Sequence, residues 1–352
     1  MPPAKKDRFP ILSLSSLPSE CIAKQLSCSD VFLFSTISKD CFDMMKDGLR
    51  STPNRRRMTL DLEGDKHQLN MYCTGVSCGK SETLEWQFNG TLNRRRRWNV
   101  ELYTEFPPKT LVFREKSKGR YVTASNSVEE VLQLAEHLGN LFRAFTNHIT
   151  ISTENCRFLP AIQPVPVVRQ AGEIRVSYGI LSHDAMLRLL SGFQSKSLWI
   201  SCGVEPNFEF NGPILTEQLS IFKSSWFTAP LFHAFNGTRL VLHDSGLTNA
   251  DLNTFLRNWK AGQLGRMTYL SFHKTWNRVG FGNIDPEFQR RWDEEKWDVA
   301  KIAEGLEDIR HVPAHPMENS ESMYKRQTDG MELLLHITSV HFTGMMSMTF
   351  CY

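Results

Sequence analysis

The segment 75–81 has the composition of a phosphate-binding or catalytic loop and reads Gly-Val-Ser-Cys-Gly-Lys-Ser. A phosphate-binding loop has one more residue between its glycines than the three found between Gly75 and Gly79, so the usual backbone cradle is not expected. The segment also matches G-x-S-x-G with Ser77 at its centre. A nucleophile elbow needs a helix after the serine, whereas a strand-like run from Leu84 to Phe88 follows here. We therefore expect an exposed turn.

Two histidines at a spacing seen in metal sites are His311 and His315. Pro313 between them is incompatible with a helix interior, and no cysteine or acidic ligand is arranged around the pair. The chain also lacks the H-E-x-x-H and G-x-G-x-x-G patterns. The sequence therefore predicts no catalytic residue, no cofactor and no metal, and so a protein that is not an enzyme.

Cysteine usage also indicates structure and not chemistry. No two of the 8 cysteines form a C-x-x-C pair. In an intracellular chain we expect them all to be buried thiols. They are Cys21, Cys28, Cys41, Cys73, Cys78, Cys156, Cys202 and Cys351.

Dense basic charge is confined to two short runs, 55–57 and 94–97, each made of arginine. They could bind phosphate groups or an import receptor, but the chain as a whole carries 41 basic and 38 acidic residues, a formal charge of +3. A near-neutral chain of this kind is not typical of a nucleic-acid coat. We interpret both runs as solvated loop charge and expect nucleic acid to be an unlikely partner.

The 352 residues are enough for about two folding units, and 41% hydrophobic content can fill their cores. The first 16 residues, MPPAKKDRFPILSLSS, lack the apolar run of a secretory signal. The stretch 333–352 is free of Asp, Glu, Lys and Arg, but its alternating pattern favours a strand over a membrane span. We expect an intracellular protein, cytoplasmic or nuclear or both, without a membrane partner.

Residues 9–50 carry the pattern of three short helices. Pro18 suits a first helical turn, Ile22 and Leu26 follow on one face, Ser29 and Asp30 begin a second helix that carries Val31 and Phe34, and Ser38 caps a third. In the third helix the apolar residues are Phe42, Met45 and Leu49. Three helices of this length cannot enclose a core, so we expect the segment to dock on a partner.

Strands and strand–helix units fill the region after Pro53. We expect strands at 58–62, 68–73, 84–88 and 98–103, a helix after the capping pair Ser127 and Glu130, and another from about Thr216. The clearest crossover is 239–272, where Thr248 and Asp251 form a capping box and Gly262 closes the helix. Strand markers at Ile151, Ile200, Leu242 and Leu270 differ by 49, 42 and 28 residues.

This element order predicts an α+β fold. A short three-helix segment precedes a strand–helix repeat region, and a β-hairpin at 323–352 closes the chain around Asp329 and Gly330. The irregular spacing is compatible with a degenerate leucine-rich-repeat-like stack, and a doubly wound sheet is the alternative.

Two sets of residues resemble a known family. Residues 9–14, Phe-Pro-Ile-Leu-Ser-Leu, with Ile22, Leu26 and the segment 35–39 resemble the F-box. The segment 247–262, Leu-Thr-Asn-Ala-Asp-Leu-Asn-Thr-Phe-Leu-Arg-Asn-Trp-Lys-Ala-Gly, resembles the type 2 F-box-associated domain. The Leu-Pro pair of the F-box would fall at Leu14-Ser15, whereas this chain has Leu17-Pro18.

The resemblance implies a disordered tail at 1–8, an F-box-like docking module at 9–52 and a substrate-binding region at 53–322, with the F-box-associated segment around 195–275. The hairpin at 323–352 would pack on that region. It also implies a Skp-type adaptor, and through it a cullin, as partners. The adaptor contacts would be Pro10, Leu12, Leu14, Pro18, Ile22, Leu26 and Val31.

Two functions therefore stand at this point. The first is the substrate-recognition subunit of a Skp-cullin-F-box ubiquitin ligase, which binds the adaptor with its first helices and an unknown protein substrate with its C-terminal region. The alternative is an interaction scaffold outside any ligase, with a repeat-like binding face.

Overall fold

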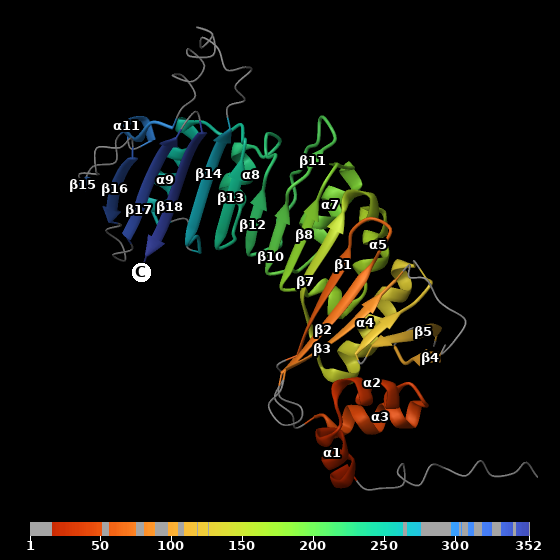
Figure 1. The fold of residues 1–352 in the computed structure, drawn as a ribbon. Coiled ribbons are helices and arrows are strands. Elements are labelled where there is room, and N and C mark those ends of the chain that lie inside the picture. Colours follow the sequence, from red (N-terminus) through yellow and green to blue (C-terminus); the bar gives the residue numbers. More distant parts are fainter. Residues whose placement is uncertain are drawn as a thin grey trace, which may run out of the picture. The chain divides into compact units, whose positions relative to one another are not determined.

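The computed structural model in Figure 1 describes most of the chain, with gaps between the described ranges. These ranges are 16–50, 56–74, 81–88, 98–104, 109–117, 119–125, 127–262, 266–275, 297–302, 304, 309–312, 319–325, 332–340 and 343–351. The expected tail at 1–8, the loop at 75–80, the arginines 94–97, and His315 therefore lie outside the described residues.

The chain divides into two compact units, Met1–Arg175 and Val176–Tyr352. This division differs from the boundaries expected after residues 52 and 322. The reason is that the N-terminal helices share a core with the strands that follow them, and that the C-terminal strands extend a sheet of the second unit. We describe each unit by itself.

The first unit begins with three helices, as expected: α1 (Ser16–Gln25), α2 (Cys28–Ser35) and α3 (Lys39–Gly48). The cap of α3 is Ser38, whose side chain accepts a hydrogen bond from the Cys41 N–H at 3.1 Å. The second helix starts slightly earlier than expected, because Ser27 caps it through the N–H of Asp30.

A mixed sheet follows in the first unit, and its strand order is β7-β1-β2-β3-β6-β5-β4. β1–β2, β2–β3, β4–β5 and β5–β6 are antiparallel, while β1–β7 and β3–β6 are parallel. The strands are β1 (Arg56–Leu62), β2 (Gln68–Thr74), β3 (Ser81–Gln87), β4 (Trp98–Leu102), β5 (Lys109–Ser117), β6 (Arg120–Val122) and β7 (Phe145–Ser152).

Helix α4 (Val128–Phe142) contacts this sheet and the first helices. Its expected capping box is wrong: the Ser127 hydroxyl donates to the Glu129 carboxylate at 2.6 Å and not to the pair with Glu130. The helix forms without the box because its apolar face is buried by tertiary contacts. Short turns complete the unit: η2 (Thr153–Phe158), α5 (Leu159–Ile162) and α6 (Pro166–Arg169).

The second unit is built on parallel strands in the order β8-β10-β12-β13-β14, where β8 contains the division between the units. The strands are β8 (Glu173–Ser177), β10 (Ser197–Ile200), β12 (Gln218–Ile221), β13 (Arg239–His243) and β14 (Tyr269–Thr275). The helices are α7 (His183–Gly192), α8 (Ala229–Ala234), α9 (Asn249–Lys260) and α11 (Val299–Ile302), and β9 (Ile180–Leu181) pairs with β11 (Gly203–Val204).

One expected helix is wrong. The segment after Thr216 forms β12, because Leu219 and Ile221 alternate into the core and the backbone pairs in parallel with β10 and β13. The Thr216 hydroxyl donates to the Ser195 carbonyl at 3.0 Å and so ties the start of β12 to the preceding loop. In register, Ile200, Ile221 and Leu242 are equivalent and 21 residues apart, so the expected spacing of 42 residues spans two crossovers.

The C-terminal strands continue the sheet of the second unit. β18 (Thr343–Cys351) pairs antiparallel with β14, and β17 (Glu332–Val340), β16 (Asn319–Lys325) and β15 (Ile309–Val312) follow in antiparallel order. β16 and β17 form the expected hairpin, whose turn residues lie outside the described ranges. The hairpin joins the sheet edge through β18 and does not pack on a face.

Candidate protein-binding surfaces

The N-terminus of α2 is held on the strands of the first unit by polar contacts. The Cys28 N–H donates to the Glu82 carboxylate of β3 at 2.7 Å, and the Ser29 and Tyr121 hydroxyls share a hydrogen bond of 2.5 Å. Burial raises the pKa of Tyr121 to about 12, so its hydroxyl stays protonated at neutral pH. Two side chains far along the sequence therefore fix the first turn of α2.

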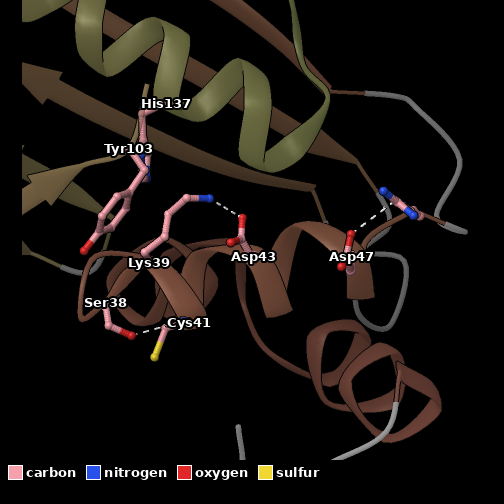
Figure 2. Close-up of polar contacts among 8 residues, drawn as sticks. Ser38, Lys39, Cys41, Asp43, Asp47, Tyr103 and His137 are labelled. Carbon is pink, nitrogen blue, oxygen red and sulfur yellow. Dashed lines mark hydrogen bonds and ion pairs between the residues drawn. The ribbon is translucent and has the colours of Figure 1, made fainter. Parts of the chain in front are cut away.

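A buried histidine fixes the other end of α2. The Tyr103 N–H donates to His137 Nδ1 at 3.0 Å, which places the ring proton on Nε2, 3.2 Å from the Ser35 hydroxyl. The Ser35 hydroxyl in turn donates to the Phe32 carbonyl at 2.7 Å. Burial lowers the pKa of His137 to about 3, so the ring is neutral. Figure 2 shows the His137 and Tyr103 side chains close to α3.

Aromatic rings fill the space between the helices and the rest of the first unit. The Phe32 ring meets Trp86 and Tyr121 edge-on, at centroid distances of 5.1 and 5.4 Å. The Phe42 ring of α3 lies 4.9 Å from the His137 ring. The inner sides of α2 and α3 are thus covered by β3, β6 and α4 of the same chain.

The expected adaptor contacts fall into three groups. Pro10, Leu12 and Leu14 lie outside the described residues, and Pro18 lies in α1 with its side chain outside them. Ile22 and Leu26 are half-buried. Val31 is fully buried in the first unit, so its side chain is not accessible to a partner in this structure.

Sequence reasoning missed the most exposed apolar side chain of the helical segment. Ile37, between α2 and α3, is 67% exposed, and Leu33 and Phe34 before it are half-buried. Its position within the F-box-like segment 35–39 was the available signal. We call Ile22, Leu26, Leu33, Phe34 and Ile37 the accessible helical residues.

Two expectations about polar residues are corrected in the first unit. Arg56 is not solvated: it is 2% exposed, and its guanidinium donates to the Phe142 carbonyl at 2.8 Å across β1 and α4. Burial lowers its pKa, which remains opposed by the nearby Cys73 and Cys28. Cys21 is exposed on α1 and is not a buried thiol, whereas the described Cys28, Cys41, Cys73, Cys156 and Cys202 are buried.

In the second unit the two faces of the parallel strands differ. One face carries buried aliphatic and aromatic residues, and α8 and α9 pack on it: the Phe232 ring stacks on Phe255 at 4.7 Å and meets Phe272 at 5.5 Å. Figure 1 shows α7, α8 and α9 on this one side of the strands. The residues of this inner face are Leu198, Ile200, Leu219, Ile221, Leu240, Leu242, Leu270 and Phe272.

The opposite face, which we call the open face, carries a row of rings. Trp199, Phe222, His243 and His273 come from four neighbouring strands or their ends, at successive centroid distances of 5.4, 4.1 and 4.1 Å. Phe222, His243 and His273 are stacked nearly parallel. We call these four residues the ring row.

The two imidazoles of the ring row are neutral at pH 7. Burial, together with the charge of His273, lowers the pKa of His243 to about 4 against the opposing effect of Asp244. Burial also lowers the pKa of His273, whose Nε2 lies 3.1 Å from the Ser271 hydroxyl. The ring row is therefore an uncharged aromatic surface, 36% exposed at Trp199.

A cation lies beside the ring row on the same open face. The Arg239 guanidinium lies 4.5 Å from the centroid of the Tyr269 ring, one strand away. In the described parts of the chain, no carboxylate forms an ion pair with Arg239. This surface can therefore offer an apolar contact and a positive charge together.

Other kinds of site find no support in the residues that the structure describes. They contain no group of three His, Cys, Asp or Glu side chains placed to hold a metal ion. None of their helices has both the length and the apolar character needed to cross a bilayer. The two surfaces above are the places where these residues expose apolar side chains in an organised setting.

Comparison with known proteins places one family in the second unit. Residues 213–272, from the loop before β12 through β14, match the family described as F-box associated. No curated protein and no solved structure matches the chain. The matched segment contains the capping box of α9, in which the Thr248 side chain accepts from the Asp251 N–H and the Asp251 carboxylate accepts from the Thr248 N–H.

Proposed function

From a chain that contains an F-box-associated segment, we propose a substrate-recognition subunit of a Skp-cullin-F-box ubiquitin ligase. Its N-terminal helices bind a Skp-type adaptor, and through it a cullin, while its second unit holds a protein substrate. The chain makes and breaks no covalent bond. It raises the effective concentration of the substrate near a ubiquitin-loaded enzyme, so its contribution is positioning.

The observation that carries this proposal is the order of the two parts. An F-box-associated segment at 213–272 follows a three-helix segment at 16–48. That segment keeps its accessible helical residues exposed although its inner side is covered. Ile37 alone is 67% exposed, which is unusual for an isoleucine and favours a partner there.

We further infer that β10, β12 and β13 with their connections form a degenerate leucine-rich-repeat-like stack. Support comes from the recurrence of equivalent core residues every 21 residues, at Ile200, Ile221 and Leu242. Stacks of this kind leave one strand face open for binding. The substrate region of the proposed receptor is therefore the second unit.

The test is co-purification of the full-length chain with a Skp-type adaptor. The variants Ile22→Asp, Leu26→Asp and Ile37→Asp each introduce a carboxylate among the accessible helical residues. Burying such a charge at an interface costs on the order of 2 kcal/mol, or roughly thirtyfold in affinity. We expect adaptor recovery to fall accordingly, most of all for Ile37→Asp.

The matched control is Leu187→Asp, which makes the same kind of change at a 41% exposed leucine of α7 in the second unit. It should leave adaptor recovery unchanged. Circular dichroism and thermal unfolding check that every variant folds. The full chain is required because Phe32 and Phe42 pack on Trp86 and His137, which a short N-terminal fragment lacks. Equal recovery of the adaptor by all folded variants would contradict the proposal.

A second function is favoured by a specific observation. The inner sides of α2 and α3 are covered by the chain's own strands and α4, with Val31, Phe32 and Met45 fully buried. A scaffold outside any ligase, whose helices serve only its own core, accounts for that burial. Folded wild-type protein that binds no Skp-type adaptor would select this function.

A further inference from the structure

We propose that the open face of β10, β12, β13 and β14 binds an extended peptide segment of a partner protein. The segment carries an acidic side chain three or four residues from a large apolar one. As the face that holds the substrate, this surface rests on the proposed receptor function. Its binding of peptide can be measured separately.

The apolar contact is made by the ring row. Trp199 is 36% exposed at one end, and its ring lies 5.4 Å from Phe222. The stacked imidazoles of His243 and His273 continue this surface and are neutral. Large aromatic side chains on an accessible surface are the anchors that contribute most to binding. An apolar side chain of the partner would lie against Trp199 and Phe222.

The charge of the open face selects an acidic partner. Successive residues of a strand point to opposite faces, so the residues between the inner-face residues line the open face. None of these residues in the four strands is Asp or Glu, and Arg239 is a cation among them. The nearest acidic residue is Asp244, which lies past the end of β13 beside the imidazoles.

Arg239 is arranged to accept a carboxylate. Its guanidinium rests on the Tyr269 ring, which holds the planar group in place while leaving its donors available. No described carboxylate forms an ion pair with it. An Asp or Glu of the partner can therefore bind bidentately at this position.

The strand register sets the spacing in the peptide. Trp199 is in register with Ser220 and Val241, so Arg239 lies two strands and two residues away from Trp199. With about 4.8 Å between strands and about 3.3 Å per residue, their Cα atoms are about 12 Å apart. An extended chain covers this distance in about three to four residues.

The experiment selects peptides from a phage-displayed library of random dodecapeptides on the immobilised full-length protein. We expect the selected sequences to share an Asp or Glu three or four positions from an aromatic or large aliphatic residue. Selection on Arg239→Glu should replace the acidic residue with Lys or Arg at the same spacing. Synthetic peptides of the selected sequences should bind Trp199→Ala and Arg239→Glu about tenfold or more weakly than wild type.

The controls make the same chemical changes elsewhere in the second unit. Leu187→Ala removes an exposed apolar side chain from α7, and Arg266→Glu reverses an exposed charge before β14. Both should bind the peptides as wild type does. Circular dichroism verifies the fold of all four variants.

Three results would overturn the inference: no enriched peptide, enriched peptides without the acidic and apolar pair, or equal binding by Trp199→Ala and Arg239→Glu. Adaptor recovery measured on the same variants separates the two proposals. Peptide binding by a protein that recovers no adaptor would refute the ligase function and leave the peptide surface standing. Adaptor recovery without peptide binding would do the reverse.

Discussion

His137 Nε2 lies 3.2 Å from the Ser35 hydroxyl, which joins α4 to the end of α2 across 102 residues of sequence. The same ring accepts the Tyr103 N–H at its Nδ1. One neutral imidazole thus links the helical segment to both α4 and the chain after β4. The accessible helical residues are presented by a segment that is anchored to the first unit and not suspended from a linker.

Replacing this ring should weaken the first unit. His137→Leu keeps an apolar side chain of similar size but removes the acceptor of the Tyr103 N–H and the donor to Ser35. Leaving buried polar groups without these bonds costs about 1–3 kcal/mol of unfolding free energy. Urea unfolding measures the change. Lys39→Ala is the control, because its exposed pair with Asp43, drawn in Figure 2, contributes at most about 0.5 kcal/mol.

Stability should also fall in acid because of His137. Its pKa is lowered from 6.5 in the unfolded chain to about 3 in the folded protein, so the unfolded chain binds the proton first. The unfolding free energy should therefore drop by roughly 1.4 kcal/mol per pH unit as the pH falls through this window, and be unaffected by this group above it. Urea unfolding between pH 7 and pH 4.5 tests this. A slope in His137→Leu as steep as in wild type would show that other groups cause the loss.

The hydroxyl of Tyr121 should contribute to the docking of α2. Tyr121→Phe removes the 2.5 Å hydrogen bond to Ser29 while keeping the ring contacts with Phe32 and Trp86. The expected loss is about 1–2 kcal/mol, measured by urea unfolding. Tyr72→Phe, at a 42% exposed tyrosine of the same unit, should change stability by less than about 0.5 kcal/mol. Equal effects of the two substitutions would argue against a role for the bond.

The capping box of α9 should stabilise the F-box-associated segment. Thr248→Ala removes the side chain that accepts the Asp251 N–H at 3.3 Å and donates to the Asp251 carboxylate at 2.8 Å. A lost N-cap costs about 1 kcal/mol, visible as a lower midpoint for unfolding of the second unit. Thr254→Ala, at an exposed position inside the same helix, should not lower the midpoint because alanine favours helix. A midpoint unchanged in Thr248→Ala would contradict this role.

Local signals in the sequence predicted elements whose caps are made by near neighbours. Ser38 and Thr248 begin helices where expected, since each bonds an N–H three residues away and needs no distant partner. The strand register of β16 and β17 also agrees with the expected hairpin. The Ser127 and Glu130 pair had the same pattern, yet its hydroxyl bonds Glu129, because several local geometries compete for one side chain.

The segment after Thr216 shows a different limit. Leu219, Phe222 and Trp226 have a helical spacing, but β10 and β13 supply backbone partners that favour a strand, and these partners are distant in sequence. The regular spacing of 21 residues between core positions became visible only with this strand in place. The irregular spacing seen in the sequence was a consequence of the missing strand.

By itself, the sequence determined the mixed α and β character, the N-terminal helices, the α9 cap and the resemblance to an F-box-associated segment. These follow from periodicity and from side chains that act within one turn. Only the tertiary structure decided which apolar residues are covered. Val31 became core, Ile37 remained exposed, Arg56 was buried, and Trp199, Phe222, His243 and His273 formed one row. The physical reason is that burial depends on partners brought by strand pairing and helix docking, and residue type and spacing do not specify those partners.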